Sequence, residues 1–498
     1  MNQERVAVME PSAGGPGAPS GGSIADEPAF EQRGIDYIPQ SERRGKPIDL
    51  SWMWAGALFN VEYVVYGALI VSFGLSFWQA AAVVVIGNLS YLITGLGSVQ
   101  GPEAGTSAFA ISRASFGPNG ARGVSLFNWI TQVGYETEGL ALVVLAGLVL
   151  AGKAGVHTST GLKVVLIVAA ATVQLFLPLM GHGMMMRILR FLALPFVVLF
   201  IVLAILTLPK AHLSGGPSAD WQTMLVALAL ILSAGGYGWV MNANDYSRYL
   251  PRNASRKRIV WSVALGGYVP STLLCLLGAA VATAVPTASD PISGLPHAFA
   301  SWFLVPYLIF VIIQLFAINS IDLYSSGLTL QAIIPNIKRW QCVLIDTTVA
   351  GALTAVAIFS SGFNTFLEDF LLFMIIWIAP WVTIYLVDWY LRRGTYDSRS
   401  LLNGRAGIYW RQGGIHVPGV VAQVVGMLAA ASFLNTTVWQ GPFVGLTNPG
   451  GPASYGADFS VFMGAIFGGV TYYVLARRTV PNEAHTDAEP ATVAISTP

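Results

Sequence analysis

The sequence predicts an all-α integral membrane protein with about 12 transmembrane helices. The chain is 54% hydrophobic and only 10% charged, which is far from the composition of a soluble domain. Its apolar residues also gather into twelve blocks, each near or above the ~20 residues that cross a bilayer. The blocks lie at residues 52–74, 76–100, 122–152, 161–181, 189–209, 222–242, 259–285, 299–334, 343–361, 364–391, 415–436 and 457–476.

The positive charges predict the orientation of these helices. Of the 26 Lys and Arg residues, all but Lys153, Lys163 and Lys210 lie in the tails and alternate gaps on the side of the N-terminus. Because basic loops stay on the cytoplasmic side, we expect a multi-pass protein of the cell (plasma) membrane with both termini in the cytoplasm. A net charge of +1 gives no reason to expect a nucleic-acid partner; the bilayer is the expected environment.

The polar segments lie at the two ends of the chain. Residues 1–32 are rich in Gly, Ser, Pro and Ala and contain no apolar run, so we expect a disordered tail rather than a signal peptide. A second disordered tail is expected at 479–498. Residues 33–478 then form a single domain that contains all twelve helices.

The first and sixth blocks contain interruptions. Asn60 and Glu62 lie near the centre of block 52–74, and three glycines between residues 235 and 238 weaken the helix of block 222–242. Two interrupted helices five apart in order are typical of transporters built from inverted repeats, whose site lies at the middle of the membrane. The alternative is that the glycines only permit close helix packing.

The third and eighth blocks carry polar groups near their middles. Ionisable groups in a span by default mark a cavity, an ion path or a proton relay. Together with amides and aromatic rings, they suit a flat polar heterocycle, which offers faces for stacking and edges for hydrogen bonds. At 100° per residue, one face of the third helix holds Gln132, Tyr135, Glu136 and Gly139, with Glu138 about 60° beyond Tyr135, and one stripe of the eighth holds Asn319, Asp322 and Ser326.

Four stretches resemble the purine–cytosine permease branch of the nucleobase:cation symporter-1 family. The first is Gly238-Trp239 followed by Asp245-Tyr-Ser-Arg-Tyr-Leu-Pro251, which resembles the family's Gly-Trp and Asp-Tyr-x-x-Tyr-x-Pro segments. The resemblance runs in order from about residue 33 to 478. The other three stretches are Ser112 to Gly120 after Gly101-Pro102, Thr131 to Tyr135, and Asn319 to Ser325.

The resemblance implies a leucine-transporter-like fold of two inverted five-helix repeats plus two extra helices. It implies a secondary active transporter that imports a nucleobase, cytosine and/or purines, by alternating access, without catalytic residues, cofactor or metal site. We expect it to function as a monomer. The implied substrate-binding residues are Trp239 and Tyr135 for stacking, Gly238 beside them, Gln132 and Asn319 for the ring edge, and Asp322 and Glu138 for substrate N–H groups.

The coupling ion is expected to be a proton rather than sodium. Sodium-coupled relatives have two hydroxyl residues in the eighth helix where this chain has Ala317 and Ile318, whose side chains cannot bind a hard cation. The candidate ion-coupling residues are Glu62, Glu136, Asp322 and Asn60.

Three alternatives stay open on the residues alone. One is a transporter of the same fold for allantoin, hydantoin, uracil or a vitamin-like ring, with sodium coupling. The second is a channel, against which stand the interrupted helix pair and the lack of charged rings or filter glycine repeats. The third is a membrane enzyme, but the spans contain no nucleophile elbow, cofactor loop or His-rich metal set.

Overall fold

The structure, a computed structural model, describes residues 34–179, 182–214, 216–360, 369–452 and 456–483, and within these ranges the regular elements are helices joined by loops. In these ranges eight helical runs are long and apolar enough to cross a membrane, and one bent pair makes a ninth span. Three shorter apolar helices complete the twelve predicted segments. The predicted all-α membrane fold is confirmed.

The twelve segments follow the predicted blocks closely. The first is α1 (Pro47–Leu58) with α2 (Val61–Ser72), the second α3 (Phe77–Asn88) with α4 (Tyr91–Gly97), and the sixth α11 (Trp221–Ala234) with α12 (Gly236–Trp239). The others are α8 (Pro118–Lys153), α9 (Thr160–Leu179), α10 (His182–Thr207), α14 (Arg256–Ala282), α15 (Leu304–Ile333), α16 (Arg339–Phe359), α18 (Ile375–Leu391), α20 (Val417–Phe433) and α21 (Ser460–Ala476). Short helices α5 (Gln100–Ala104), α6 (Ala108–Ile111), α7 (Arg113–Phe116), α13 (Ala243–Ser247) and α19 (Ser398–Leu402) lie between them.

The first span breaks at its predicted interruption. The axes of α1 and α2 differ by 61°, with Phe59 and Asn60 at the bend. Asn60 caps the new helix, because its side-chain oxygen accepts a hydrogen bond from the backbone N–H of Glu62 at 3.2 Å. The polar residue in the middle of the span therefore supplies an acceptor that the interrupted backbone needs.

The sixth span breaks at Gly235. The backbone groups released there are paired with the second span: Gly236 N–H donates to Ser90 Oγ at 3.0 Å, and the Thr94 hydroxyl donates to Gly236 O at 2.7 Å. A Cβ atom on Gly236 would lie 2.2 Å from the backbone nitrogen of Tyr91. Only glycine permits this approach, so both readings of the glycines, interruption and close packing, apply.

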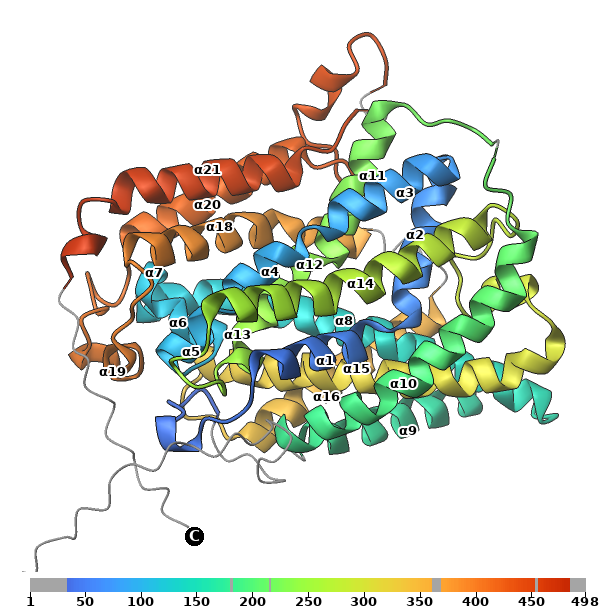
Figure 1. Cartoon of the computed structure of the whole chain (residues 1–498), viewed down its shortest axis with the longest axis horizontal. Coiled ribbons are helices and arrows are strands. Elements are labelled where there is room, and N and C mark those ends of the chain that lie inside the picture. The colour runs from blue at the N-terminus through green and yellow to red at the C-terminus, as the bar shows by residue number, and fades with distance from the viewer. Residues whose placement is uncertain (1–33, 180–181, 215, 361–368, 453–455, 484–498) are drawn as a thin grey trace, which may run out of the picture.

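Both described ends of the chain lie at one end of the bundle, at the left in Figure 1, together with α5, α7, α13 and α19. We call this the basic end. The buried Arg248 holds the N-terminal segment there, donating to Gly34 O at 2.7 Å and to the Tyr324 hydroxyl at 2.9 Å. Asn244 Oδ1 accepts from Gly101 N–H at 2.6 Å. This polar segment after α12 is thus structural: it joins the sixth span to the loop between the second and third.

The side of the bundle formed by α10 and α16 carries large apolar side chains with no protein cover. Phe191 is 76% exposed, Leu194 71% and Val356 65%. In water such a surface would be unfavourable, whereas lipid tails are an apolar solvent for it. The pattern fits the predicted membrane environment.

Helices α2 and α14 approach each other through a reciprocal glycine contact. A Cβ atom on Gly67 would lie 1.9 Å from the carbonyl oxygen of Cys275, and a Cβ on Gly278 would lie 1.9 Å from that of Val64. Each helix therefore places a glycine against the backbone of the other. Small residues allow such contact between membrane helices, where van der Waals packing drives association.

We expect Gly67→Ala to destabilise the protein by about 1–3 kcal/mol, because the added methyl overlaps backbone atoms that cannot yield. The measurement is the apparent melting temperature of the purified protein in detergent. Gly123→Ala is the matched control, because a Cβ on Gly123 in α8 meets nothing within 4 Å. Equal melting temperatures for both variants would contradict the close α2–α14 contact.

Candidate functional site

Two aromatic rings face each other at the break of the sixth span. Tyr135 of α8 and Trp239 of α12 have ring planes only 16° apart and centroids 6.3 Å apart. A flat ring between them would need about 7 Å, since carbon atoms in contact are separated by about 3.5–4.0 Å. The two rings must therefore move apart to admit a flat ring between them.

The Tyr63 hydroxyl fixes the Trp239 ring. Trp239 Nε1 donates to it at 2.9 Å, and the same hydroxyl lies 2.9 Å from that of Tyr91. The indole of Trp54 contacts Trp239 edge to face at 5.6 Å. Trp239 is therefore held in one orientation by α2, α4 and α1, while its face toward Tyr135 is available for stacking.

Polar groups lie beside the rings. Gln132, one turn before Tyr135, donates from Nε2 to Asn242 Oδ1 at 2.6 Å. Among the described residues, neither Gln132 Oε1 nor the Tyr135 hydroxyl has a hydrogen-bond partner, although both are buried. A Cβ on Gly238 would lie 3.2 Å from the Tyr135 hydroxyl, so a side chain there would narrow the space beside that group. Buried polar atoms of this kind are suited to a polar ligand.

Three carboxyl groups converge on the same region from three helices. Glu138 of α8 accepts a hydrogen bond from the Tyr66 hydroxyl at 3.4 Å, and it is close enough to Glu62 and Asp322 to interact with both. All three are buried. Glu138 Oε2 and Asp322 Oδ1 have no partner among the described side chains and backbone. Such acceptors can bind N–H groups of a ligand, or take up a proton themselves.

Glu136 lies on a different face of α8 from Tyr135, and Asn319 of α15 contacts α8 at Glu136. The Asn319 amide donates to Gln174 Oε1 of α9 at 2.8 Å and to the backbone oxygen of Glu136 at 3.2 Å. The Glu136 carboxyl interacts with Asp322 and with Asp346 of α16. The 100° face predicted for α8 is therefore divided, because Glu136 is turned by about 100° from its neighbour Tyr135.

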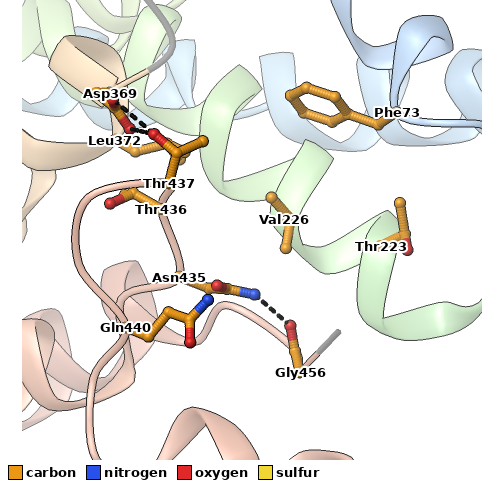
Figure 2. A pocket seen from close by; sticks show the side chains of 10 residues that line it. All are labelled: Phe73, Thr223, Val226, Asp369, Leu372, Asn435, Thr436, Thr437, Gln440 and Gly456. Atoms are coloured by element: carbon orange, nitrogen blue, oxygen red, sulfur yellow. Dashed lines mark hydrogen bonds between the residues drawn. The ribbon is translucent and has the colours of Figure 1, made fainter. Parts of the chain in front are cut away.

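A cavity of about 250 Å³ opens at the end opposite the basic end. Figure 2 shows its residues, which come from the end of α2, from α11, from the helical stretch at 369–391 and from the loop between α20 and α21. Thr437 of that loop donates to Asp369 at 2.8 Å. Next to Asp369, the Phe370 ring contacts Tyr135 edge to face at 5.3 Å. The segment that lines the cavity with Asp369 and Leu372 thus also contacts the ring pair, through Phe370.

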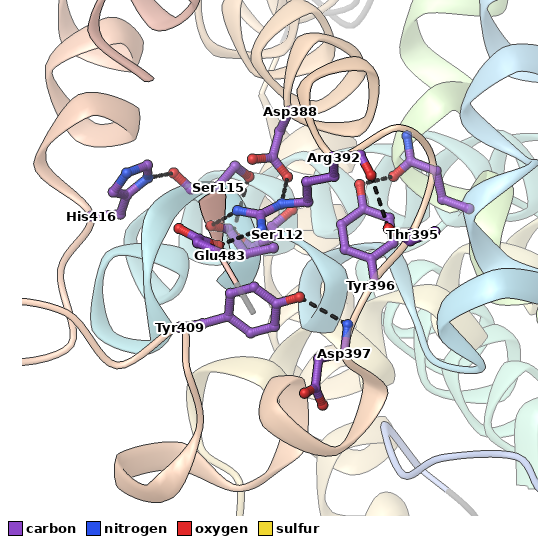
Figure 3. A network of polar contacts seen from close by, with 12 residues as sticks. Ser112, Ser115, Asp388, Arg392, Thr395, Tyr396, Asp397, Tyr409, His416 and Glu483 are labelled. Carbon is purple, nitrogen blue, oxygen red and sulfur yellow. Dashed lines mark hydrogen bonds and ion pairs between the residues drawn. The ribbon is translucent and has the colours of Figure 1, made fainter. Parts of the chain in front are cut away.

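A second polar network lies at the basic end and holds the described C-terminal residues (Figure 3). Arg392 donates to Asp388 Oδ2 at 2.8 Å, to Glu483 Oε2 at 2.5 Å and to the backbone of Ala114 at 3.0 Å. Glu483 also pairs with Arg411. Residues 479–483, expected to begin a disordered tail, instead include the 3-10 helix η10 (Val480–Asn482) and this ion pair. The expected disorder of 1–32 and of 484–498 lies outside the described residues.

Several residues of the site could not be named from the sequence. Tyr63 is the residue after Glu62, and Tyr66 lies one helical turn further on. Their contacts with the site arise from the 61° bend between α1 and α2. Phe370 reaches the site only because its segment packs against α8, where its ring contacts Tyr135. Asp346 could have been found, because it is an acid within the predicted block 343–361.

The chain is similar to known membrane proteins over most of its length. A family model described as "Permease for cytosine/purines, uracil, thiamine, allantoin" matches residues 37–456. The Bacillus subtilis protein YxlA is 27% identical over 91% of this chain and 97% of its own length. The purine-cytosine permease FCY21 of Saccharomyces cerevisiae is 25% identical, covering 91% and 87%. The cytosine permease of Escherichia coli K12 is 26% identical, covering 72% and 81%.

Solved structures show the same fold. Mhp1, a nucleobase-cation-symport-1 family transporter solved in a closed conformation with bromovinylhydantoin bound, has a TM-score of 0.71 at 17% identity, covering 92% of this chain and 96% of Mhp1. A Na⁺-coupled sialic acid symporter has a TM-score of 0.59 at 13% identity, covering 93% and 95%. The predicted leucine-transporter-like architecture is confirmed by this likeness.

We expect Arg392→Met to destabilise the protein by about 3–5 kcal/mol, because the buried Asp388 would lose its ion-pair partner and Glu483 would keep only Arg411. Thermal unfolding in detergent measures the loss. Arg399→Met is the control, since Arg399 is exposed. Adding Asp388→Asn to the Arg392 variant should recover part of the stability; no difference between the single and double variants would contradict the proposed pairing.

Proposed function

Because this chain belongs to the family of permeases for cytosine/purines, uracil, thiamine and allantoin, we propose that it imports a nucleobase, cytosine or a purine, by alternating access. It is a transporter rather than an enzyme, as its permease relatives indicate. The observation that supports the nucleobase is the pair of nearly parallel rings of Tyr135 and Trp239, flanked by buried polar atoms without partners.

In the proposed complex the base lies between the rings of Tyr135 and Trp239 above Gly238. The Gln132 amide oxygen and the Tyr135 hydroxyl meet its edge, while Glu138 and Asp322 accept its N–H groups. Carboxylates accept without donating, so they favour bases with an amino group or several ring N–H groups. Asn319 is held by α9 and the α8 backbone, and it reaches the base only if that contact is exchanged.

Protons drive the proposed import. Ala317 and Ile318 offer no side-chain oxygen to sodium. Glu62 and Asp322, in contrast, are carboxyl groups near the proposed site, and Glu136 lies on the neighbouring face of α8. A carboxyl group inside the membrane is more easily buried when it is protonated. Asn60, the remaining candidate for ion coupling, caps α2 and lies beside Glu62 at the bend of the first span.

The proposed transporter works as a monomer in the plasma membrane, with its basic end in the cytoplasm. The distribution of Lys and Arg supports this orientation. The cavity beside Phe370 then lies on the outer side, where a base enters.

We expect Trp239→Ala to remove one stacking face, worth about 1–3 kcal/mol, and so to raise the half-saturation concentration for uptake roughly 5- to 150-fold. Trp239→Phe should retain part of the affinity. Uptake of radiolabelled cytosine and adenine in cells measures this, with Trp302→Ala as control because Trp302 is 64% exposed. Unchanged kinetics in a correctly inserted Trp239→Ala protein would place the substrate elsewhere.

Proton coupling predicts accumulation without sodium. In proteoliposomes with an inward proton gradient and choline in place of sodium, labelled base should accumulate, and a protonophore should abolish the accumulation. Replacing choline by sodium at fixed pH should change uptake little. Accumulation that needs a sodium gradient and ignores the protonophore would assign the cation site to the backbone at the α1–α2 break.

A further inference from the structure

A second group of buried polar side chains lies behind the ring pair, between α8, α15 and α16. Glu136, Ser326 and Asp346 are each fully buried, and the indole N–H of Trp129 donates to Asp346 Oδ1. We call these four residues the Glu136–Asp346 cluster. They are separated from the substrate rings by α8 itself, since Tyr135 and Glu136 face different neighbours.

The cluster is short of hydrogen-bond donors. Both carboxylate oxygens of Glu136 and Oδ2 of Asp346 have no partner in the described part of the chain, and neither has the Ser326 hydroxyl. Ser326 lies close enough to interact with both carboxyl groups. Two carboxylates and a hydroxyl in a buried space are satisfied together only when one carboxyl carries a proton, because a protonated carboxyl supplies the missing donor.

We propose that Glu136, Ser326 and Asp346 bind the coupling proton and pass it toward the basic end by a route separate from the substrate. This rests on the proton coupling proposed above. In the step, protonated Glu136 donates to Ser326 Oγ while the Ser326 hydroxyl gives its own proton to Asp346 Oδ2. Glu136 ends ionised, Ser326 is unchanged, and Asp346 is neutral.

The proposed route begins near the substrate region at Asp322 and leads through Glu136 and Asp346 toward the basic end. Asp322 interacts with Glu136 on one side and with Glu62 on the other, so it connects the cluster to the substrate region. Asp346 is paired with Trp129, whose backbone lies seven residues, about 10 Å, before that of Glu136 on α8, so it lies on the side of Glu136 toward the basic end. Cys342 lies close enough to interact with Asp346 and also with Arg339 at the start of α16. From α9, Gln174 accepts a hydrogen bond from Asn319, which also donates to the Glu136 backbone oxygen; Gln174 does not titrate.

The test separates accumulation from exchange. In proteoliposomes, we expect Asp346→Asn and Glu136→Gln each to lower proton-driven accumulation of labelled cytosine or adenine at least tenfold. Exchange of labelled for unlabelled base, which needs no net proton movement, should keep its half-saturation concentration within twofold. Asp346→Glu keeps a carboxyl and should restore accumulation in part.

Thr354→Val is the matched control. Thr354 lies two turns after Asp346 on α16, and its hydroxyl donates to the backbone oxygen of Thr137 on α8, but it carries no carboxyl group. It should preserve both accumulation and exchange. Native accumulation that resists a protonophore would contradict the proton coupling and, with it, this route. If native accumulation is sensitive to the protonophore but both acid variants accumulate normally, the route alone is wrong. A parallel loss of accumulation and exchange would make the cluster structural and would also overturn the proposal.

Discussion

The architecture depends on one constraint: a backbone that leaves the helical hydrogen-bond pattern inside a membrane must find other partners. At the first break, Asn60 supplies an acceptor from its own side chain. At the second, Ser90 and Thr94 bind both the N–H and the carbonyl of Gly236. These bonds make the interruptions stable, and the interruptions turn Tyr63 and Trp239 toward each other and toward α8.

Helix α8 then distributes the chemistry. Tyr135 and Gln132 meet the broken sixth span, Glu138 meets α2, and Glu136 meets α15 and α16. One helix thus presents stacking, recognition and acid groups to different neighbours within two turns. In the proposed mechanism the base and the proton occupy different faces of α8 and are coupled through Asp322, which interacts with both Glu136 and Glu138.

The spans and their two interruptions could be predicted, because in lipid the length of an apolar block and the placement of a polar residue decide the structure. The pairing of Tyr135 with Trp239 could be predicted only through the family resemblance, since it joins distant parts of the sequence. The separation of Glu136 from Tyr135 was not resolved, because a helical wheel gives directions without neighbours. The hydrogen bonds of Tyr63 with Trp239 and Tyr91 depend on a bend whose angle no local pattern specifies. The position of residues 479–483 depends on Arg392 and Arg411, which are distant in the sequence.

The reciprocal contact of Gly67 and Gly278 has a mechanical meaning. At these two glycines no side chain separates α2 from α14, so the two backbones touch, and Trp239 is bonded to α2 through Tyr63. A second helix pair consists of α8 and α15, joined by the bond from Asn128 to Thr329 at 2.8 Å, and it carries Tyr135. Because Trp239 is bonded to one helix pair and Tyr135 belongs to the other, a small rotation of one pair against the other would change the distance between the two rings. The hydrogen bonds from Gln132 to Asn242 and from Tyr66 to Glu138 join the two sides, so such a rotation would have to stretch or break them.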